Sequence, residues 1–268
     1  MAYEKLKYGV VNLLDLASLT FEGWTEDPDY PKENLFNKRM SKRGGFAGSR
    51  SGSIVIDLGS TQTVNGIALM NHNLTSGATI SIAGNSSNSW GSPAFSVTIP
   101  YREFDAAIVF DIDQDYRYWR LSVNDSGRAD ADVKIGELIL SNLTTLSRNH
   151  DWNLKEQHSY GNIKHETEGG NTWAYTLNNR KSWVMTWTNI TGADLSPITT
   201  LIRSVHGRAY PFLMILEDAP YFVRAQDDVL FERPVEIADF EALGPDIFPI
   251  DYAIHELIFT EETRGINT

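Results

Sequence analysis

Six histidines and 35 acidic residues are the side chains of this 268-residue chain best suited to act as bases, acids or metal ligands. Their spacing indicates no such chemistry. No His-Glu-x-x-His pattern sets two imidazoles on one helix face, and no Gly-x-Ser-x-Gly turn presents a nucleophile. The stretch "GGFAGSRSGS" lacks the Lys-Ser/Thr ending of a phosphate-binding loop. We therefore predict no enzyme activity, no catalytic residue, no metal site and no cofactor.

Charge and composition limit the partners further. The formal charge of −12 gives no electrostatic gain on nucleic acid, so we expect no nucleic-acid partner. No apolar run reaches the ~18 residues of a membrane helix, and no secretory signal is recognisable, which predicts synthesis in the cytoplasm and no membrane insertion. The absence of cysteine excludes disulfides and thiolate chemistry. Paired carboxylates for glycan hydrolysis remain an alternative, because their separation in space is not given by a sequence.

Short apolar–polar alternations fill residues 52–142 at intervals of ~10 residues, separated by Gly, Asn, Asp or Pro. This pattern predicts an antiparallel β-sandwich or barrel rather than alternating strands and helices. The expected strands are "SIVIDLG", "VNGIALMNHNL", "ATISIAG", "AFSVTIP", "AAIVFDID", "YWRLSVN" and "VKIGELILS". In "YWRLSVN" we expect Trp119 and Leu121 on one face and Tyr118 and Arg120 on the other, with Arg120 paired to Glu137. "PKENLFNK" is expected to form one short helix.

The second half has a different pattern. "TWAYTLNNRKSWVMTW" predicts a β-hairpin that turns at Asn178 and Asn179. "DLSPITTLIRSVHG" predicts one α-helix, capped by Ser196, with Pro197 in its first turn and ended by Gly207. Further strands are expected in "FLMILED", "YFVRAQ", "PVEIADFEAL" and "DYAIHELIFTEE".

The first half resembles the discoidin, or galactose-binding-like, jelly roll. The likeness lies in "NLFNK", "IDLG", "GIAL" and the closing "YWRL…IGEL" pair. It implies a jelly-roll sandwich over residues 30–142, with sugars, lipid head groups or proteins as ligand classes bound by loops at one end. Some members of that family hold a structural Ca²⁺ partly through the Glu that opens the last strand, here Glu137.

Trp90 carries the prediction of a ligand face. It lies in "GNSSNSWGSP", where an aromatic ring beside Asn and Ser is suited to stack on a sugar and bond its hydroxyls. The alternative is that Trp90 folds back as an apolar plug under its own loop. The predicted glycan face comprises His72, Asn85, Asn88, Trp90, Asp125 and Arg128.

The second half resembles the distal-tail and minor-tail proteins at the tail tip of long-tailed bacteriophages. The resemblance lies in "SWVMTWTNITGADLSPITTLIRSVHGRAYPFLMI" and the terminal "ELIFTE". It implies a ring-forming homo-oligomer in the phage tail, in contact with the tail tube and with baseplate or tail-fibre proteins. Trp173, Trp183 and Trp187 are candidate interface residues, and the alternative is that they form one domain's core.

Taken together, these observations predict an all-β, mainly antiparallel chain, a jelly-roll β-sandwich followed by a second β-domain with one short α-helix. The expected organisation is an arm over 1–29, the jelly roll over 30–142, a linker over 143–170 and the ring-type domain over 171–268. The leading hypothesis is a structural component of a phage tail tip, located in the virion, with host-surface glycan as an additional candidate partner. The second hypothesis is a lectin-like carbohydrate-binding protein without a tail role.

Overall fold

The structure of the protein is a computed structural model that describes residues 5–130, 132–152, 154–168, 170–226, 231–232 and 252–262. Antiparallel strands dominate these residues, and a single α-helix lies among them. No helix in the described ranges is long and apolar enough to cross a lipid bilayer. The predicted all-β class is therefore confirmed.

The chain divides into two compact units, which are described separately here. The first comprises Met1–Thr144, Phe212–Phe222 and Glu262–Thr268, and the second comprises Thr145–Pro211 and Val223–Glu261. The division falls inside strand β15. Residues 212–222, which we expected in the second domain, therefore belong with the first unit.

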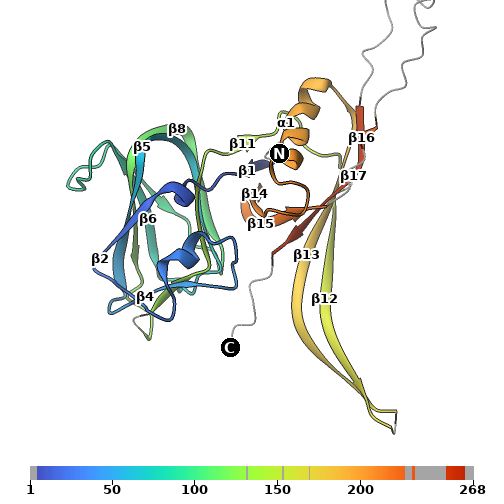
Figure 1. Cartoon of the computed structure of the whole chain (residues 1–268), viewed down its shortest axis with the longest axis horizontal. Coiled ribbons are helices and arrows are strands. Elements are labelled where there is room, and N and C mark those ends of the chain that lie inside the picture. The colour runs from blue at the N-terminus through green and yellow to red at the C-terminus, as the bar shows by residue number, and fades with distance from the viewer. Residues whose placement is uncertain are drawn as a thin grey trace, which may run out of the picture. The chain divides into compact units, whose positions relative to one another are not determined.

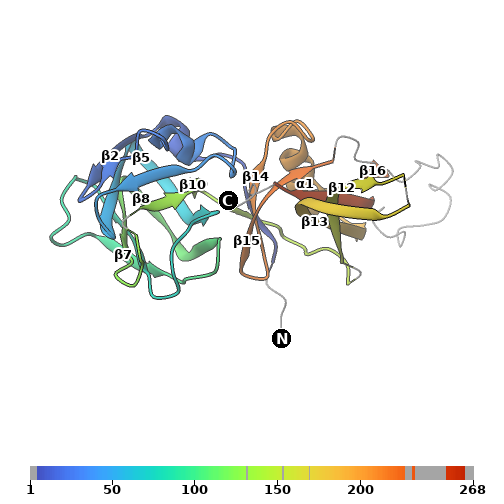
Figure 2. The ribbon, with the colours of Figure 1, turned by 90° about the horizontal axis from the view of Figure 1, so that it is seen from below.

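Two long strands form the centre of the first unit, β5 (Ser51–Met70) and β8 (Ala106–Asn124) (Figures 1 and 2). They pair antiparallel, with register shifts between Asp57 and Gln62 and between Val64 and Gly66. Each long strand combines two of the strands expected from the sequence. Such irregularities bend a strand, and this lets one strand run on where the sequence suggested two.

The other strands of the jelly roll are added to this central pair. The larger sheet has the order β10 (Glu137–Ser141), β5, β8, β6 (Thr79–Asn85), β7 (Phe95–Ile99), and β2 (Ser18–Glu22) also pairs with β5. The smaller sheet has the order β3 (Thr25–Glu26), β4 (Gly44–Ala47), β9 (Val133–Ile135). A short 3₁₀ helix, η2 (Lys32–Phe36), occupies the predicted helical position.

Alternation along β8 positions the core. Trp119, Leu121 and Val123 are buried, and the Trp119 ring stacks on Phe110 with centroids 5.9 Å apart. Arg120 points to the opposite face, as the sequence predicted, because successive side chains of a strand alternate. Its expected partner was wrong, since Arg120 Nη2 lies 3.1 Å from a carboxylate oxygen of Glu22.

The residues predicted as an N-terminal arm are instead part of the sandwich. Residues 18–26 form β2 and β3, and the 3₁₀ helix η1 (Leu13–Leu16) precedes them. Buried Asn12 fastens this segment to β10, because its Nδ2 donates to the Leu138 carbonyl at 2.8 Å and its Oδ1 accepts from the Leu140 N–H at 3.2 Å. The side chain of Asn12 thus satisfies two backbone groups on the free edge of β10.

Residues 212–222 also complete the first unit. Strand β1 (Lys7–Gly9) pairs antiparallel with β14 (Phe212–Leu216). Leu213 and Ile215 join a buried cluster with Met70 and Ile139. Residues 212–222 therefore cover an apolar face of the jelly roll's own strands.

The second unit is built on β12 (Lys155–Glu166), β13 (Thr172–Ile190) and β17 (Tyr252–Glu261). β17 pairs with β13, with the end of β15 (Ala219–Ala225) and with β16 (Phe231–Glu232). The predicted linker over 143–170 contains the strand β12 and, near its start, the two-residue strand β11 (Thr144–Thr145). The expected strand over 234–243 lies outside the described residues.

The hairpin turn is also displaced from its predicted place. Asn178 and Asn179 lie within β13, opposite Gly161 and Tyr160, and the chain reverses at residues 167–171 instead. Because β17 pairs with β13 only from Ser182 onward, the rest of the hairpin is a free two-stranded ribbon (Figure 1). We call residues 158–181 the arm.

Helix α1 (Gly192–Ser204) packs an apolar stripe that includes Ile198, Leu201 and Val205, all of which are buried. Its N-cap is Thr191, not the predicted Ser196, and the Thr191 hydroxyl accepts from the Asp194 N–H at 3.2 Å. The helix ends at Ser204, three residues before the predicted stop at Gly207, and the Gly207 N–H donates to the Ile202 carbonyl at 3.1 Å just beyond this end.

Candidate functional site

Trp90, Asn85 and Asn88 come together in the loop that joins β6 to β7. The Trp90 Nε1–H donates to the Asn88 side-chain oxygen at 2.8 Å, and the Asn85 amide donates to the Ser89 carbonyl at 2.7 Å. Trp90 is half-buried, and its ring centroid lies 5.9 Å from Arg120 Cζ. The ring is thus held against a side chain of the neighbouring strand rather than extended into solvent.

His72, Asp125 and Arg128 are held inside the fold. His72 and Asp125 are buried, and Asp125 accepts from both the N–H and the hydroxyl of Thr75 at 2.8 and 2.5 Å. Arg128 is bound to the Asp130 carboxylate and to the Asn73 carbonyl. Asp125 and Arg128 thus fix the loops after β5 and β8 to one another, whereas His72 accepts from the Leu74 N–H within its own loop.

The six candidates do not form one face. Asn85 lies opposite Tyr118 at one end of β6, whereas Thr79, at the other end, lies opposite Asn124, next to the Asp125 loop. Six residue steps along a strand span about 20 Å. Asn85 and the loop that carries Asp125 and Arg128 therefore lie at opposite ends of β6.

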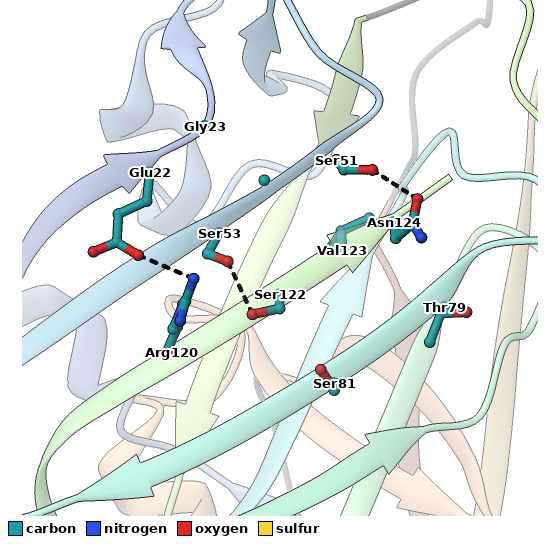
Figure 3. A pocket seen from close by; sticks show the side chains of 11 residues that line it. Glu22, Gly23, Ser51, Ser53, Thr79, Ser81, Arg120, Ser122, Val123 and Asn124 are labelled. Carbon is teal, nitrogen blue, oxygen red and sulfur yellow. Dashed lines mark hydrogen bonds and ion pairs between the residues drawn. The ribbon is translucent and has the colours of Figure 1, made fainter. Parts of the chain in front are cut away.

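An open groove lies on the outer face of the larger sheet, with a volume of about 470 Å³ (Figure 3). Six of its eleven lining residues carry a hydroxyl or amide side chain, two form an ion pair, and none is a histidine. The lining residues are Glu22, Gly23, Ser51, Gly52, Ser53, Thr79, Ser81, Arg120, Ser122, Val123 and Asn124.

Strand register explains why the hydroxyls lie together. Ser53 on β5 is the partner of Ser122 on β8, and Ser122 is the partner of Ser81 on β6. Two residues further on, Asn124 lies between Ser51 and Thr79 in the same way. Because residues two apart share a face, these pairs give two parallel rows of polar groups, and the strands are about 4.8 Å apart.

Hydrogen bonds within the rows hold their side chains. The hydroxyls of Ser53 and Ser122 lie 2.9 Å apart, and the Ser51 hydroxyl donates to the Asn124 side chain at 2.6 Å. Figure 3 shows these pairs along the groove, with the Glu22–Arg120 ion pair at one end. A hydroxyl both donates and accepts, so each serine retains capacity for a further bond to a ligand hydroxyl.

The groove contains no assembly suited to catalysis. Glu22 is the one carboxylate in the groove lining, and it is paired with Arg120. The lining holds no second acid with which Glu22 could divide the roles of general acid and general base. In the described part of the chain, no three His, Asp or Glu side chains come together in a way that would hold a metal ion.

Glu137, to which the family resemblance assigned a share in a calcium site, is fully buried. One of its oxygens accepts from the Lys38 N–H at 2.9 Å, and the other has no hydrogen-bond partner among the described residues. Burial raises its pKa from the ordinary 4.5 to about 8, an effect that the Lys38 N–H only partly offsets. The surroundings of Glu137 thus favour a neutral carboxylic acid, and among the described residues no two further acidic or histidine side chains join it in a cluster that could hold a metal ion.

The three candidate interface tryptophans differ in their exposure to solvent. Trp183 and Trp187 are buried in the second unit, as the alternative of a domain core supposed. Trp173 lies on the arm, 56% exposed, and its ring stacks on His165 at 4.3 Å. Trp173 is thus the one member of this set that lies at the surface.

The sequence reasoning missed the groove, although the signal was present. Serine, threonine or asparagine recurs at every second position in "SGS", "TIS" and "SVN", which are the segments that form the rows. The alternation was used to find the apolar face, and the opposite face was treated only as solvent-exposed. The register that aligns the three segments was not deducible from any one of them.

Comparison with known proteins returned no matching family model and no matching curated protein. Among solved structures, chitosan-binding module 1 from a chitosanase/glucanase of Paenibacillus sp. IK-5 is 22% identical, with a TM-score of 0.39, and the match covers 49% of this chain and 99% of that one. A Streptococcus pneumoniae fucose-binding module is 8% identical, with a TM-score of 0.40 and coverages of 49% and 94%. Each of these matches covers about half of this chain and nearly the whole length of the other one.

Proposed function

We propose that the first unit binds carbohydrate in the groove on its outer sheet face and performs no catalysis there. The observation that carries the proposal is the pair of hydrogen-bonded polar rows across three strands, on a surface open enough for a chain of sugars. Sugars present many hydroxyls at fixed spacing, and fixed hydroxyl and amide groups bind them without large ordering costs.

Trp90 provides an apolar element beside the same groove. Its ring lies against Arg120, which lines the groove, so a sugar at this end of the groove has an aromatic surface to stack on. The predicted role of Trp90 is kept, while Asn85 and Asn88 position the ring and its loop.

A glycan array with the full chain, followed by calorimetric titration of the best glycan, tests the proposal. We expect saturable binding that Ser122→Leu abolishes, because a leucine at the centre of the groove obstructs both rows. The matched control is Ser96→Leu on β7, an exposed strand serine outside the groove lining, which should bind as the wild type does. Absence of binding to any glycan, or release of reducing sugar from a bound one, would contradict the proposal.

A second candidate function is structural, and the arm is the observation that favours it. Tyr160, Ile163 and Trp173 expose 57, 42 and 56% of their surface on a two-stranded ribbon. Such ribbons are only marginally stable alone in water, and their open edges invite pairing. We propose on this basis that the second unit assembles with copies of itself, as a ring at a phage tail tip, with the tail tube and baseplate or fibre proteins as neighbours in the virion.

Electron microscopy and light scattering of the purified chain test this second candidate. Rings that are lost when residues 158–181 are replaced by a two-residue Asn-Gly turn would support it. A chain that stays monomeric at the highest attainable concentration would argue against it.

A further inference from the structure

The ion pair at the end of the groove has a geometry suited to controlling ligand charge. Arg120 Nη2 and Glu22 Oε2 lie 3.1 Å apart, and the two side chains remain 30% and 44% exposed. Both line the groove, and the Arg120 guanidinium also lies against the Trp90 ring. A ligand that stacks on Trp90 therefore meets this pair.

An arginine beside an aromatic ring, taken by itself, would favour an anionic sugar. Guanidinium groups bind carboxylates through two parallel hydrogen bonds, and these are among the stronger contacts a surface can offer. Glu22 already pairs with the Arg120 guanidinium, through one nitrogen–oxygen contact of 3.1 Å. The remaining lining side chains are uncharged, so the groove as a whole carries no net charge.

The charge of the whole chain acts in the same direction. At −12 it repels anions at a distance, and a groove without a positive surplus offers nothing to overcome that repulsion. We propose, on the basis of the carbohydrate-binding function above, that the groove selects neutral glycans and that Glu22 is the residue that excludes anionic ones.

Glu22 is well placed for a test because the pair contributes little to folding. It is the last residue of β2, and its side chain is substantially exposed. Exposed ion pairs add little stability, so replacing Glu22 by Gln leaves the sandwich intact. Glu103→Gln is the matched control. Glu103 is exposed and belongs to the same unit, and the substitution removes the same charge outside the groove.

The experiment measures binding of fully N-acetylated chitotetraose, which is neutral, and of a hyaluronan tetrasaccharide, which alternates N-acetylglucosamine with glucuronate. Further neutral and uronate-containing glycans are compared on an array. We expect the wild type to favour neutral glycans. Glu22→Gln should raise the ratio of anionic to neutral binding by about tenfold or more at low salt, because it frees a charged hydrogen-bond donor. The gain should shrink at high salt, and Glu103→Gln should leave the ratio unchanged.

Two results would overturn the inference alone. One is wild-type binding to uronate glycans that equals binding to neutral ones. The other is an unchanged ratio in Glu22→Gln while Ser122→Leu still abolishes binding. If no form of the chain binds any glycan, or if Ser122→Leu has no effect on binding, the groove function itself fails and the inference fails with it.

Discussion

The jelly roll and the arm use the same element, a long antiparallel strand, in opposite ways. From Trp119 to Asn124, β8 buries every second side chain and presents the others to the groove. Along the arm, the side chains described in β12 between His158 and Glu166 are exposed on both faces. The first strand is fixed by its core, whereas the second has only its partner strand.

This difference divides stability from interaction. A strand with one buried face has a single register, because a one-residue slip would expose the whole core. A ribbon with two exposed faces lacks that constraint and gains stability from whatever covers it. Substitutions in the two regions should therefore differ in size and in kind.

The largest expected contrast is between two tryptophans. Trp119→Ala should lower the free energy of unfolding by about 3–5 kcal/mol, because it empties a buried site stacked on Phe110. Trp173→Ala on the arm should change it by no more than about 0.5 kcal/mol. Urea unfolding followed by circular dichroism measures both, and equal effects would show that the arm shares the core's stability.

The next largest expected effect is the change of folding stability with pH that Glu137 causes. Its pKa is about 8 in the folded chain against an ordinary 4.5, so the folded state holds a proton that the unfolded state releases. Stability should therefore fall as pH rises from about 4.5 to about 8, by a total on the order of a few kcal/mol. Glu137→Gln should remove this fall and be the more stable form at pH 9.

Thermal unfolding of both forms at several pH values provides the measurement. Parallel curves for the wild type and Glu137→Gln would contradict a buried neutral acid. Repeating the series with millimolar Ca²⁺ tests the calcium role that the family resemblance implied, and we expect no shift in Tm.

Asn12→Ala should cost about 2–4 kcal/mol, because it leaves the Leu138 carbonyl and the Leu140 N–H without their side-chain partner. Asn88→Ala, at an exposed loop position, is the matched control and should cost less than about 0.5 kcal/mol. If both substitutions had the same small effect, residues 1–29 would behave as a separate N-terminal segment and not as part of the sandwich.

The smallest expected effect is that of shortening the arm. Replacing residues 158–181 by an Asn-Gly turn keeps the pairing of β13 with β17 from Ser182 onward. Unfolding of the first unit should be unchanged in urea, while any self-association should be lost. A clear loss of stability in the first unit would mean that the arm is part of its fold.

The same contrast explains how much was predictable from the sequence. Regular alternation at Ile54, Ile56 and Trp119 predicted the jelly-roll strands and their inner face, and the burial of these residues agrees. The first strand of the arm was predicted to be a linker because residues 155–166 have no apolar stripe. Partners distant in sequence, such as Asn12 with β10 or Glu22 with Arg120, follow from tertiary contacts that no local pattern specifies.

For the site, the sequence led to Trp90 and to its loop but not to the surface beside it. His72 and Asp125 were polar residues between strands, which is equally the composition of a structural hydrogen-bond network, and the structure places both in the interior. The groove depends on three segments aligned by register, so it becomes visible only when β5, β8 and β6 are placed side by side.

A crystal structure of the full chain with the best neutral glycan from the array tests the central claim most directly. The account predicts sugar density along the polar rows, with hydroxyls bonded to Ser53, Ser122 or Ser81 and one ring against Trp90. Sugar bound at the Asp125–Arg128 loop, with the groove filled only by solvent, would contradict it.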